Sequence, residues 1–232
     1  MCDNNNNLTL NTSSSIWCML KLNTIIYQNI SLNLIAIGFN SGKIIIVDLS
    51  KMDIHQEINN DYKVYSLTQF KNDNNYLIYS LSNGMLKIYI LKENKYEHLQ
   101  TLEKPEEIKR GEINKVITLS DGNLATAERG AISIWKPIIN NSEKIFELYK
   151  EIITEEDTCQ LLEINPLIFA CAIYKTKLIK IFKKKDDDYL LLGEIKNAES
   201  HGENSNGMAK INDNIFCSGV DNSFIYIVSV LP

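Results

Sequence analysis

Arginine is almost absent from this chain, and no excess of lysine makes up for it. Of the 24 basic residues among 232, only Arg110 and Arg129 are arginines, and 29 Asp and Glu residues give a formal net charge of −5. Such a chain has no overall positive field to attract a phosphate backbone or an anionic membrane surface. We therefore expect no nucleic-acid partner.

Cysteine is sparse and shows neither a metal-binding nor a disulfide pattern. The five cysteines are odd in number and contain no CxxC pair, so neither a zinc site nor a disulfide framework is indicated. This usage is typical of a reducing compartment. The cysteines are Cys2, Cys18, Cys159, Cys171 and Cys217.

Long apolar runs are missing too. The first residues, Met1 to Asn7, lack the basic and apolar regions of a secretory signal. No stretch approaches the roughly 18 apolar residues that a membrane span requires. We expect no transmembrane segment and a cytoplasmic location, with the nucleus as the alternative.

Catalytic signatures are absent from the sequence. It contains no G-x-S-x-G, HExxH or Walker pattern, and His55, His98 and His201 stand far apart at non-equivalent points. We predict that the chain is not an enzyme and uses no cofactor. No catalytic, cofactor-binding or metal-ligating residue is assigned.

What the sequence does contain is one strand-turn-strand signature repeated five times. Each copy ends in a bulky residue, and these residues are 42, 46, 47 and 46 positions apart. A period of about 20 to 50 residues indicates a repeat architecture. We call the bulky residues the marker residues: Val47, Tyr89, Trp135, Phe182 and Val228.

Small residues and turns recur in phase with the marker residues. Hairpin-type turns precede four of them, at Ser41-Gly42, Asn83-Gly84, Arg129-Gly130 and Asn222-Ser223, whereas Thr176-Lys177 is a weak turn. The residues nine positions before the marker residues are Gly38, Ser80, Thr126, Ile173 and Gly219. Four of these five are small, which favours close packing between neighbouring strands near a crowded axis.

Further strand-like runs flank each signature. Inner runs precede it at residues 16–22, 64–70, 113–119, 159–164 and 208–211, and outer runs follow it at 52–58, 96–102, 145–153 and 189–195. Four short strands in about 45 residues make a propeller blade. We predict an all-β fold: a β-propeller of about five four-stranded blades at residues 16–58, 64–102, 113–153, 159–195 and 206–230, after a polar N-terminal segment at 1–15.

The third repeat resembles a WD repeat. Ile132-Ser133-Ile134-Trp135 follows Leu124-Ala125-Thr126-Ala127 and a glycine turn, and the other repeats resemble degenerate versions. In the family an aspartate follows the tryptophan, but Lys136 stands there, and Asp48 follows Val47 instead of a tryptophan. The Gly-His pair of the family is missing, so its His, Ser/Thr, Trp and Asp network is not carried onto any blade as a complete set.

The resemblance implies a non-enzymatic scaffold for protein-protein interaction, an adaptor subunit of an intracellular complex. The alternative is an enzyme built on a propeller, of the hydrolase, esterase or glycosidase type. A glycosidase requires two or three carboxylates near the axis, and Glu163 is the only acid within the inner runs. We expect Trp17 and Trp135 to be core or blade-packing residues.

The fifth repeat ends directly after its third strand. An unpaired edge strand accepts another strand, so either Leu8-Thr9-Leu10 closes a five-bladed ring, or the blades form an open arc that a partner protein completes at the 215–230 edge. A lysine run from Lys175 to Lys185, followed by Asp186-Asp187-Asp188, is interpreted as an exposed strand end, and an anionic ligand is the alternative.

Overall fold

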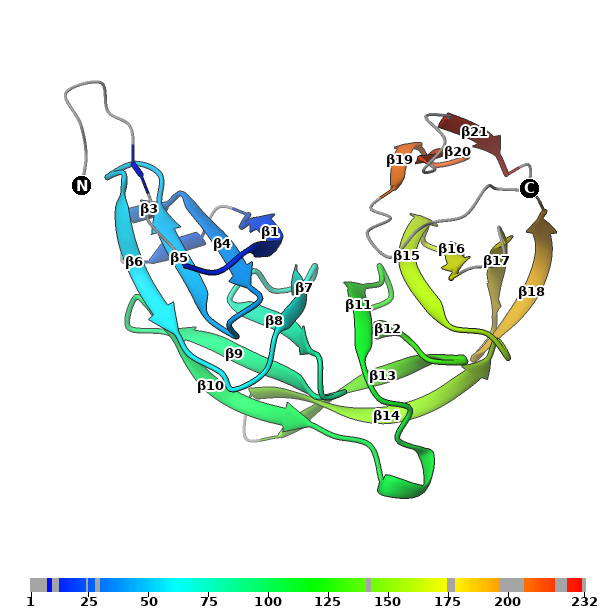
Figure 1. The fold of residues 1–232 in the computed structure, drawn as a ribbon, viewed down its shortest axis with the longest axis horizontal. Coiled ribbons are helices and arrows are strands. Elements are labelled where there is room, and N and C mark those ends of the chain that lie inside the picture. Colours follow the sequence, from blue (N-terminus) through cyan, green and yellow to red (C-terminus); the bar gives the residue numbers. More distant parts are fainter. Residues whose placement is uncertain are drawn as a thin grey trace.

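The computed structural model of this chain describes residues 8–9, 13–23, 25–27, 30–140, 143–174, 178–196, 207–219 and 225–230. Within these ranges the strands form four four-stranded antiparallel sheets and a fifth sheet of three strands. Figure 1 shows the sheets following one another along an open arc, with the first and fifth at its two ends. The predicted all-β propeller of five blades is confirmed.

Each sheet is a meander that runs from an inner strand to an outer strand. The first sheet holds β1 (Ile16–Lys21), β4 (Leu34–Phe39), β5 (Ile44–Asp48) and β6 (Asp53–Ile58), and the second β7 (Val64–Gln69), β8 (Tyr76–Leu81), β9 (Leu86–Lys92) and β10 (Lys95–Leu102). The third holds β11 (Ile113–Thr118), β12 (Leu124–Glu128), β13 (Ala131–Asn140) and β14 (Glu143–Ile153). The fourth holds β15 (Thr158–Asn165), β16 (Ile168–Ile173), β17 (Leu178–Lys185) and β18 (Asp188–Ile195), and the fifth β19 (Met208–Asn212), β20 (Ile215–Gly219) and β21 (Ile225–Ser229).

Two short elements lie outside the predicted pattern. A hairpin of β2 (Ile25–Tyr27) and β3 (Ile30–Leu32) is inserted between β1 and β4. Strands of three residues are too short for alternation of apolar and polar positions to reveal them. A 3-10 turn, Glu106–Ile108, lies in the loop before the third sheet.

The apolar core lies between successive sheets. Because side chains alternate along a strand, each third strand sends residues to both of its faces. Ile44 and Ile46 of β5 share one apolar cluster with Leu77 and Tyr79 of the second sheet. The marker residue Trp135 points the other way and lies in a cluster with Ile88 of the preceding sheet. We call these two sides the forward face, toward the next sheet, and the rear face.

Close packing near the axis explains the small residue ahead of the first marker residue. A Cβ atom on Gly38 would lie 2.7 Å from Cys18 Sγ and 2.8 Å from Val64 Cγ1. Val64 opens the inner strand of the next sheet, so Gly38 provides the space into which that sheet packs.

The outer strands of the first three sheets are joined by glutamine side chains. Gln56 Nε2 donates to the Tyr96 carbonyl at 2.7 Å, and the Tyr96 N–H donates back to Gln56 Oε1 at 2.8 Å. Gln100 and the Phe146 backbone exchange the same two bonds, both at 2.9 Å. Each glutamine therefore fixes the outer strand of the next sheet.

Candidate interaction surface at the fifth sheet

The signature residues form a repeated frame and do not converge on one place. Gly42, Gly84 and Gly130 have φ of 86°, 84° and 70° in the hairpin turns between second and third strands, as the turn prediction requires. The marker residues Tyr89, Trp135, Phe182 and Val228 each pack in a different apolar cluster. Gly38, Ser80, Thr126 and Gly219 lie on the second strands of four different sheets.

Asp48 shapes the turn between β5 and β6. Its carboxylate accepts the N–H of Ser50 at 2.9 Å and of Lys51 at 3.3 Å. Burial raises the pKa of Asp48, but these hydrogen bonds and the Lys51 charge outweigh that effect, so the pKa lies below its ordinary value. Asp48 therefore has a local structural role.

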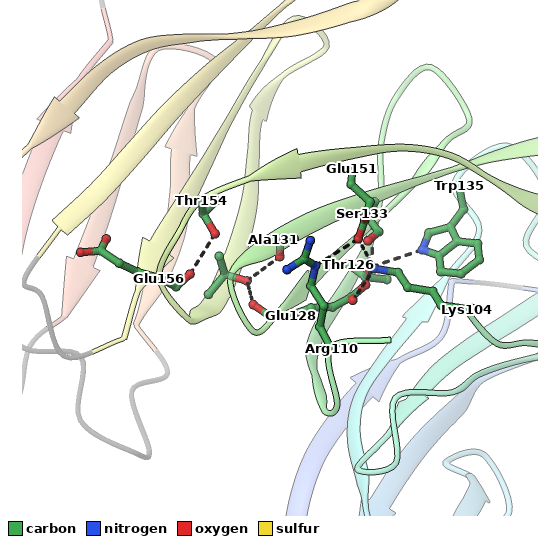
Figure 2. A network of polar contacts seen from close by, with 11 residues as sticks. Lys104, Arg110, Thr126, Glu128, Ala131, Ser133, Trp135, Glu151, Thr154 and Glu156 are labelled. Atoms are coloured by element: carbon green, nitrogen blue, oxygen red, sulfur yellow. Dashed lines mark hydrogen bonds and ion pairs between the residues drawn. The ribbon is translucent and has the colours of Figure 1, made fainter. Parts of the chain in front are cut away.

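Part of the polar network expected of a WD repeat does form in the third sheet, with different partners. Trp135 Nε1 donates to Thr126 Oγ1 at 3.2 Å, and Thr126 Oγ1 donates to Glu128 Oε1 at 2.7 Å. Lys104 Nζ then contacts Glu128 Oε2 at 2.6 Å. Figure 2 shows these side chains meeting beside Glu151. A buried Lys-Glu pair thus extends the hydrogen bond between Trp135 and Thr126.

The two described histidines lie in separate outer strands and make separate bonds. His55 Nε2 is hydrogen-bonded to the Asn94 carbonyl at 2.8 Å, and His98 Nε2 to Thr101 Oγ1 at 2.9 Å. His201 lies outside the described residues. In the described part of the chain no group of three or more His, Cys, Asp and Glu side chains is arranged to hold a metal ion.

Glu163, the one acid predicted on an inner strand, joins three sheets. Its carboxylate accepts the Ser120 N–H at 2.6 Å and the Ser120 hydroxyl at 2.9 Å, and it is ion-paired with Lys71. These partners come from the ends of the inner strands of the third and second sheets. The arrangement ties the inner strands together.

The lysine run is divided between several environments. Lys180 Nζ donates to the Thr154 carbonyl at 3.0 Å, and Lys184 is ion-paired with Asp121 of the third sheet. Lys183 and Lys185 are exposed at the end of β17. Lys175 and Lys177 lie outside the described residues.

Trp17 departs from the expectation of a core residue. Its side chain is 45% exposed, whereas Trp135 is buried. Trp17 still packs between blades, because its ring lies 5.3 Å from that of Tyr65 in the second sheet. Trp17 therefore contributes to packing between the first and second sheets from a half-exposed position.

The forward face of the fifth sheet is apolar and uncovered by any described residue. By strand register, Ile225 and Ile227 of β21 stand where the other third strands place Ile44 and Ile46, Leu86 and Ile88, Ile132 and Ile134, and Ile179 and Ile181. None of those eight side chains is more than 7% exposed, but Ile225 and Ile227 are 73% and 71% exposed. The fifth sheet thus carries the forward face of an interior blade, and no described sheet packs on it.

The surroundings of Gly219 agree with the exposure of this face. At Gly38 a Cβ atom would meet Val64 of the next sheet, but at Gly219 it would meet only Gly207, at 3.9 Å or more. Cys217, between Ile215 and Gly219 on β20, is partly exposed, whereas the equivalent Ala36 is buried. The position of a following inner strand is therefore empty among the described residues.

The outer edge of β21 is also unpaired among the described residues. In the other four sheets an outer strand pairs with the third strand, but the described fifth sheet ends at β21. Leu8 packs against the apolar cluster of Ile37, Phe39, Ile45 and Val47 in the first sheet. Leu10 of the predicted closing strand lies outside the described residues. Among the described residues the five sheets follow an open arc, with the first and the fifth at its two ends (Figure 1).

Fold and surface together define a β-propeller whose fifth sheet has, among the described residues, an uncovered forward face and an unpaired outer edge. No protein-family model matches the sequence, and no curated protein matches it. Solved structures of WD40-type propellers do share its fold. No described helix is long and apolar enough to cross a membrane.

Three such structures show the extent of the likeness. Raptor of Chaetomium thermophilum matches with a TM-score of 0.68 at 16% identity over 86% of this chain, U3-55K with 0.70 at 13% over 95%, and a chain of the mitotic checkpoint complex with 0.66 at 11% over 92%. This chain spans 18%, 63% and 68% of those chains. The likeness concerns the fold.

Proposed function

We propose that this chain is a non-enzymatic scaffold of the WD-repeat type that binds other proteins as an adaptor subunit of an intracellular complex. The observation that carries the proposal is the exposure of Ile225 and Ile227 on the forward face of the fifth sheet. A contiguous exposed apolar surface is characteristic of an interaction site. Similarity in fold to a chain of the mitotic checkpoint complex supports the same class of function.

The energetics favour a partner on this face. Burying an isoleucine side chain contributes about 1.5 to 3 kcal/mol. Two such residues, flanked by Ile215 and Cys217, form the centre of a surface that in the other blades is covered by a sheet. The partner therefore places an apolar surface against the forward face of β20 and β21.

The test compares the wild-type chain with the Ile225→Asp/Ile227→Asp variant in the cells that produce it. Wild-type tagged protein is expected to recover a stoichiometric partner, and the variant to lose it, because two carboxylates cannot be buried in an apolar interface. A photo-crosslinking residue at position 227 identifies which recovered protein touches the face.

The matched control is Ile153→Asp on β14. Ile153 is an isoleucine in a strand with similar exposure, 57%, but it lies outside the fifth sheet. It should leave recovery unchanged, and a photo-crosslinking residue at 153 should not capture the same protein. Equal recovery by the wild-type chain and the double variant would disprove the proposed site.

A further inference from the structure

The outer strands of three sheets share an aromatic residue in one register. Tyr96, Phe146 and Tyr189 pair with Leu91, Pro137 and Lys184, each of which stands two residues after the marker residue of its sheet. All three aromatic side chains are buried. Because the register and the burial are the same in all three sheets, we infer that the third strand and the rear face of each sheet form a binding position for an aromatic side chain.

Each aromatic residue packs against its own sheet and the sheet before it. Tyr189 lies with Phe169 and Phe182 in the cluster between the third and fourth sheets, and its ring is 5.5 Å from that of Phe169. Phe146 lies with Trp135 and Leu124 in the same arrangement one interface earlier. The marker residue and the second-strand residue opposite it therefore form the floor on which the aromatic side chain rests.

The fifth sheet has this floor but no described outer strand. Phe216 pairs with the marker residue Val228, as Phe169 pairs with Phe182. Val230, two residues after the marker residue, is buried in the same cluster as Phe216 and Val228. The partner position of Val230 is thus equivalent to that of Tyr96, Phe146 and Tyr189.

We propose that the free edge of β21 binds an extended segment of another polypeptide, antiparallel to β21, with an aromatic residue opposite Val230. The inference rests on the proposed scaffold function and specifies one partner contact. Main-chain hydrogen bonds along β21 supply affinity, and the aromatic residue supplies specificity, as in other cases of strand addition. The four outer strands already present define the interface that the segment continues.

The preceding outer strand leaves room for this segment. Gln56 of β6 and Gln100 of β10 bind the backbone of the next outer strand. In β18 the equivalent residue is Gly193, which pairs with Ile181 as Gln100 pairs with Ile88. A Cβ atom on Gly193 would meet no described atom within 4 Å. A glutamine at position 193 therefore has space to bind an incoming backbone.

Two other occupants fit the structure less well. Leu8 at the N-terminus packs on the first sheet, at the opposite end of the arc from β21 (Figure 1). A second copy pairing through its own β21 already has Val228 and Val230 covered by Ile168 and Ile181 of its fourth sheet. Edge-to-edge pairing would place both fourth sheets on the same side of the joined strands, where they compete for one position.

The test uses a labelled synthetic peptide with the sequence of β10, residues 95–102, and the full chain. Fluorescence anisotropy should show saturable one-to-one binding. The Tyr96→Ala peptide should bind at least about tenfold more weakly, because it no longer buries an aromatic side chain. Gly193→Gln in the chain should tighten binding about threefold or more, because it adds hydrogen bonds to the peptide backbone.

Backbone pairing has its own readout. A peptide N-methylated on the amides that face β21 should not bind, whereas one methylated on the alternate amides should bind as well as the parent. The Ile225→Asp/Ile227→Asp chain should bind the peptide normally, because those side chains lie on the forward face. If the chain binds the peptide but recovers no cellular partner, the proposed scaffold function is contradicted and strand addition is not. If it recovers a partner but does not bind the peptide, strand addition is contradicted and the scaffold function is not.

Three further results would overturn strand addition by a partner. One is binding that is unaffected by both Tyr96→Ala and Gly193→Gln. The second is displacement of the probe by a peptide of residues 4–12, which would identify the N-terminus of this chain as the occupant. The third is a dimer of the chain that the probe dissociates, which would identify a second copy as the occupant.

Discussion

Lys104 and Glu128 form a fully buried ion pair in which Nζ lies 2.6 Å from Oε2. Lys104 also contacts Glu151 Oε1 at 2.7 Å, and Arg110 Nε reaches the same oxygen at 3.3 Å. Lys104 comes from the segment after β10, whereas Glu128 and Glu151 belong to the third sheet. The ion pair therefore attaches the segment between the second and third blades to the third sheet. Through Glu128 and Thr126 it is connected to the hydrogen bond of Trp135.

Removing one member of this pair should be costly. We expect Lys104→Met to lower the free energy of unfolding by about 3 to 5 kcal/mol, because it leaves a buried carboxylate unpaired. Urea unfolding followed by circular dichroism measures this. The double variant Lys104→Met/Glu128→Leu should recover a large part of the loss, and a double variant as unstable as the sum of both single variants would contradict a paired interaction.

Acid should weaken the same network. Burial raises the pKa of Glu151, but the hydrogen bonds and charges of Lys104 and Arg110 outweigh it and place the pKa below the ordinary 4.5. A lowered carboxyl pKa stabilises the fold above the unfolded-state value, and this stabilisation is lost as the pH falls toward the folded-state value. The urea concentration at which half of the chain is unfolded should therefore decrease as the pH is lowered below about 4.5.

The Glu151→Gln variant should show a smaller decrease over that pH range. Glu147→Gln, an exposed position on the same strand, is the control and should retain the wild-type pH profile. Identical profiles for Glu151→Gln and the wild-type chain would show that another group governs acid unfolding.

The two tryptophans should respond differently to substitution. Trp135→Phe loses a buried hydrogen bond and part of a well-packed ring, so we expect a destabilisation of about 1 to 3 kcal/mol. Trp17→Phe should cost less than about 0.5 kcal/mol, because Trp17 is half exposed. Thermal unfolding measures both, and equal losses would contradict the difference in burial.

Gly42 should not tolerate a side chain. Its φ is 86°, and a Cβ atom would overlap the backbone carbonyl of Asn60. We expect Gly42→Ala to destabilise the chain by about 2 kcal/mol or more. Gly193→Ala is the control, because a Cβ atom there would meet no atom of the described residues within 4 Å. It should change the melting temperature little.

Equivalent isoleucines should differ according to whether another sheet packs on their forward face. Ile88→Asn places an amide in the core between the second and third sheets and should cost about 3 kcal/mol or more. Ile227→Asn, at the same register of the fifth sheet, should be close to neutral in the isolated chain. Similar losses at both positions in urea unfolding would show that the forward face of β21 is covered in solution.

Sequence patterns were sufficient for the number, spacing and strand content of the blades. The five marker residues and the turn glycines Gly42, Gly84 and Gly130 report local properties: alternation along a strand and φ above zero in a turn. Such properties depend on residues close together in the chain. The hairpin of β2 and β3 and the 3-10 turn at Glu106–Ile108 were not predicted, since three-residue elements leave little pattern in a sequence.

Tertiary structure decided everything that depends on contacts between blades. The sequence offered two alternatives for the fifth repeat, and only the tertiary structure shows that the described sheets follow an open arc. The sequence did not indicate that Lys104 pairs with Glu128 beside Trp135, because those residues come together only when the second and third sheets pack.

The exposure of Ile225 and Ile227 was likewise decided by contacts between sheets and not by local sequence. In sequence β21 resembles every other third strand, and its isoleucines are equivalent to residues that are buried elsewhere. Burial of a sheet face requires a second sheet, which local sequence cannot specify. The repeat itself was therefore determined by the sequence, whereas the site at its open end was determined by which sheet has no neighbour among the described residues.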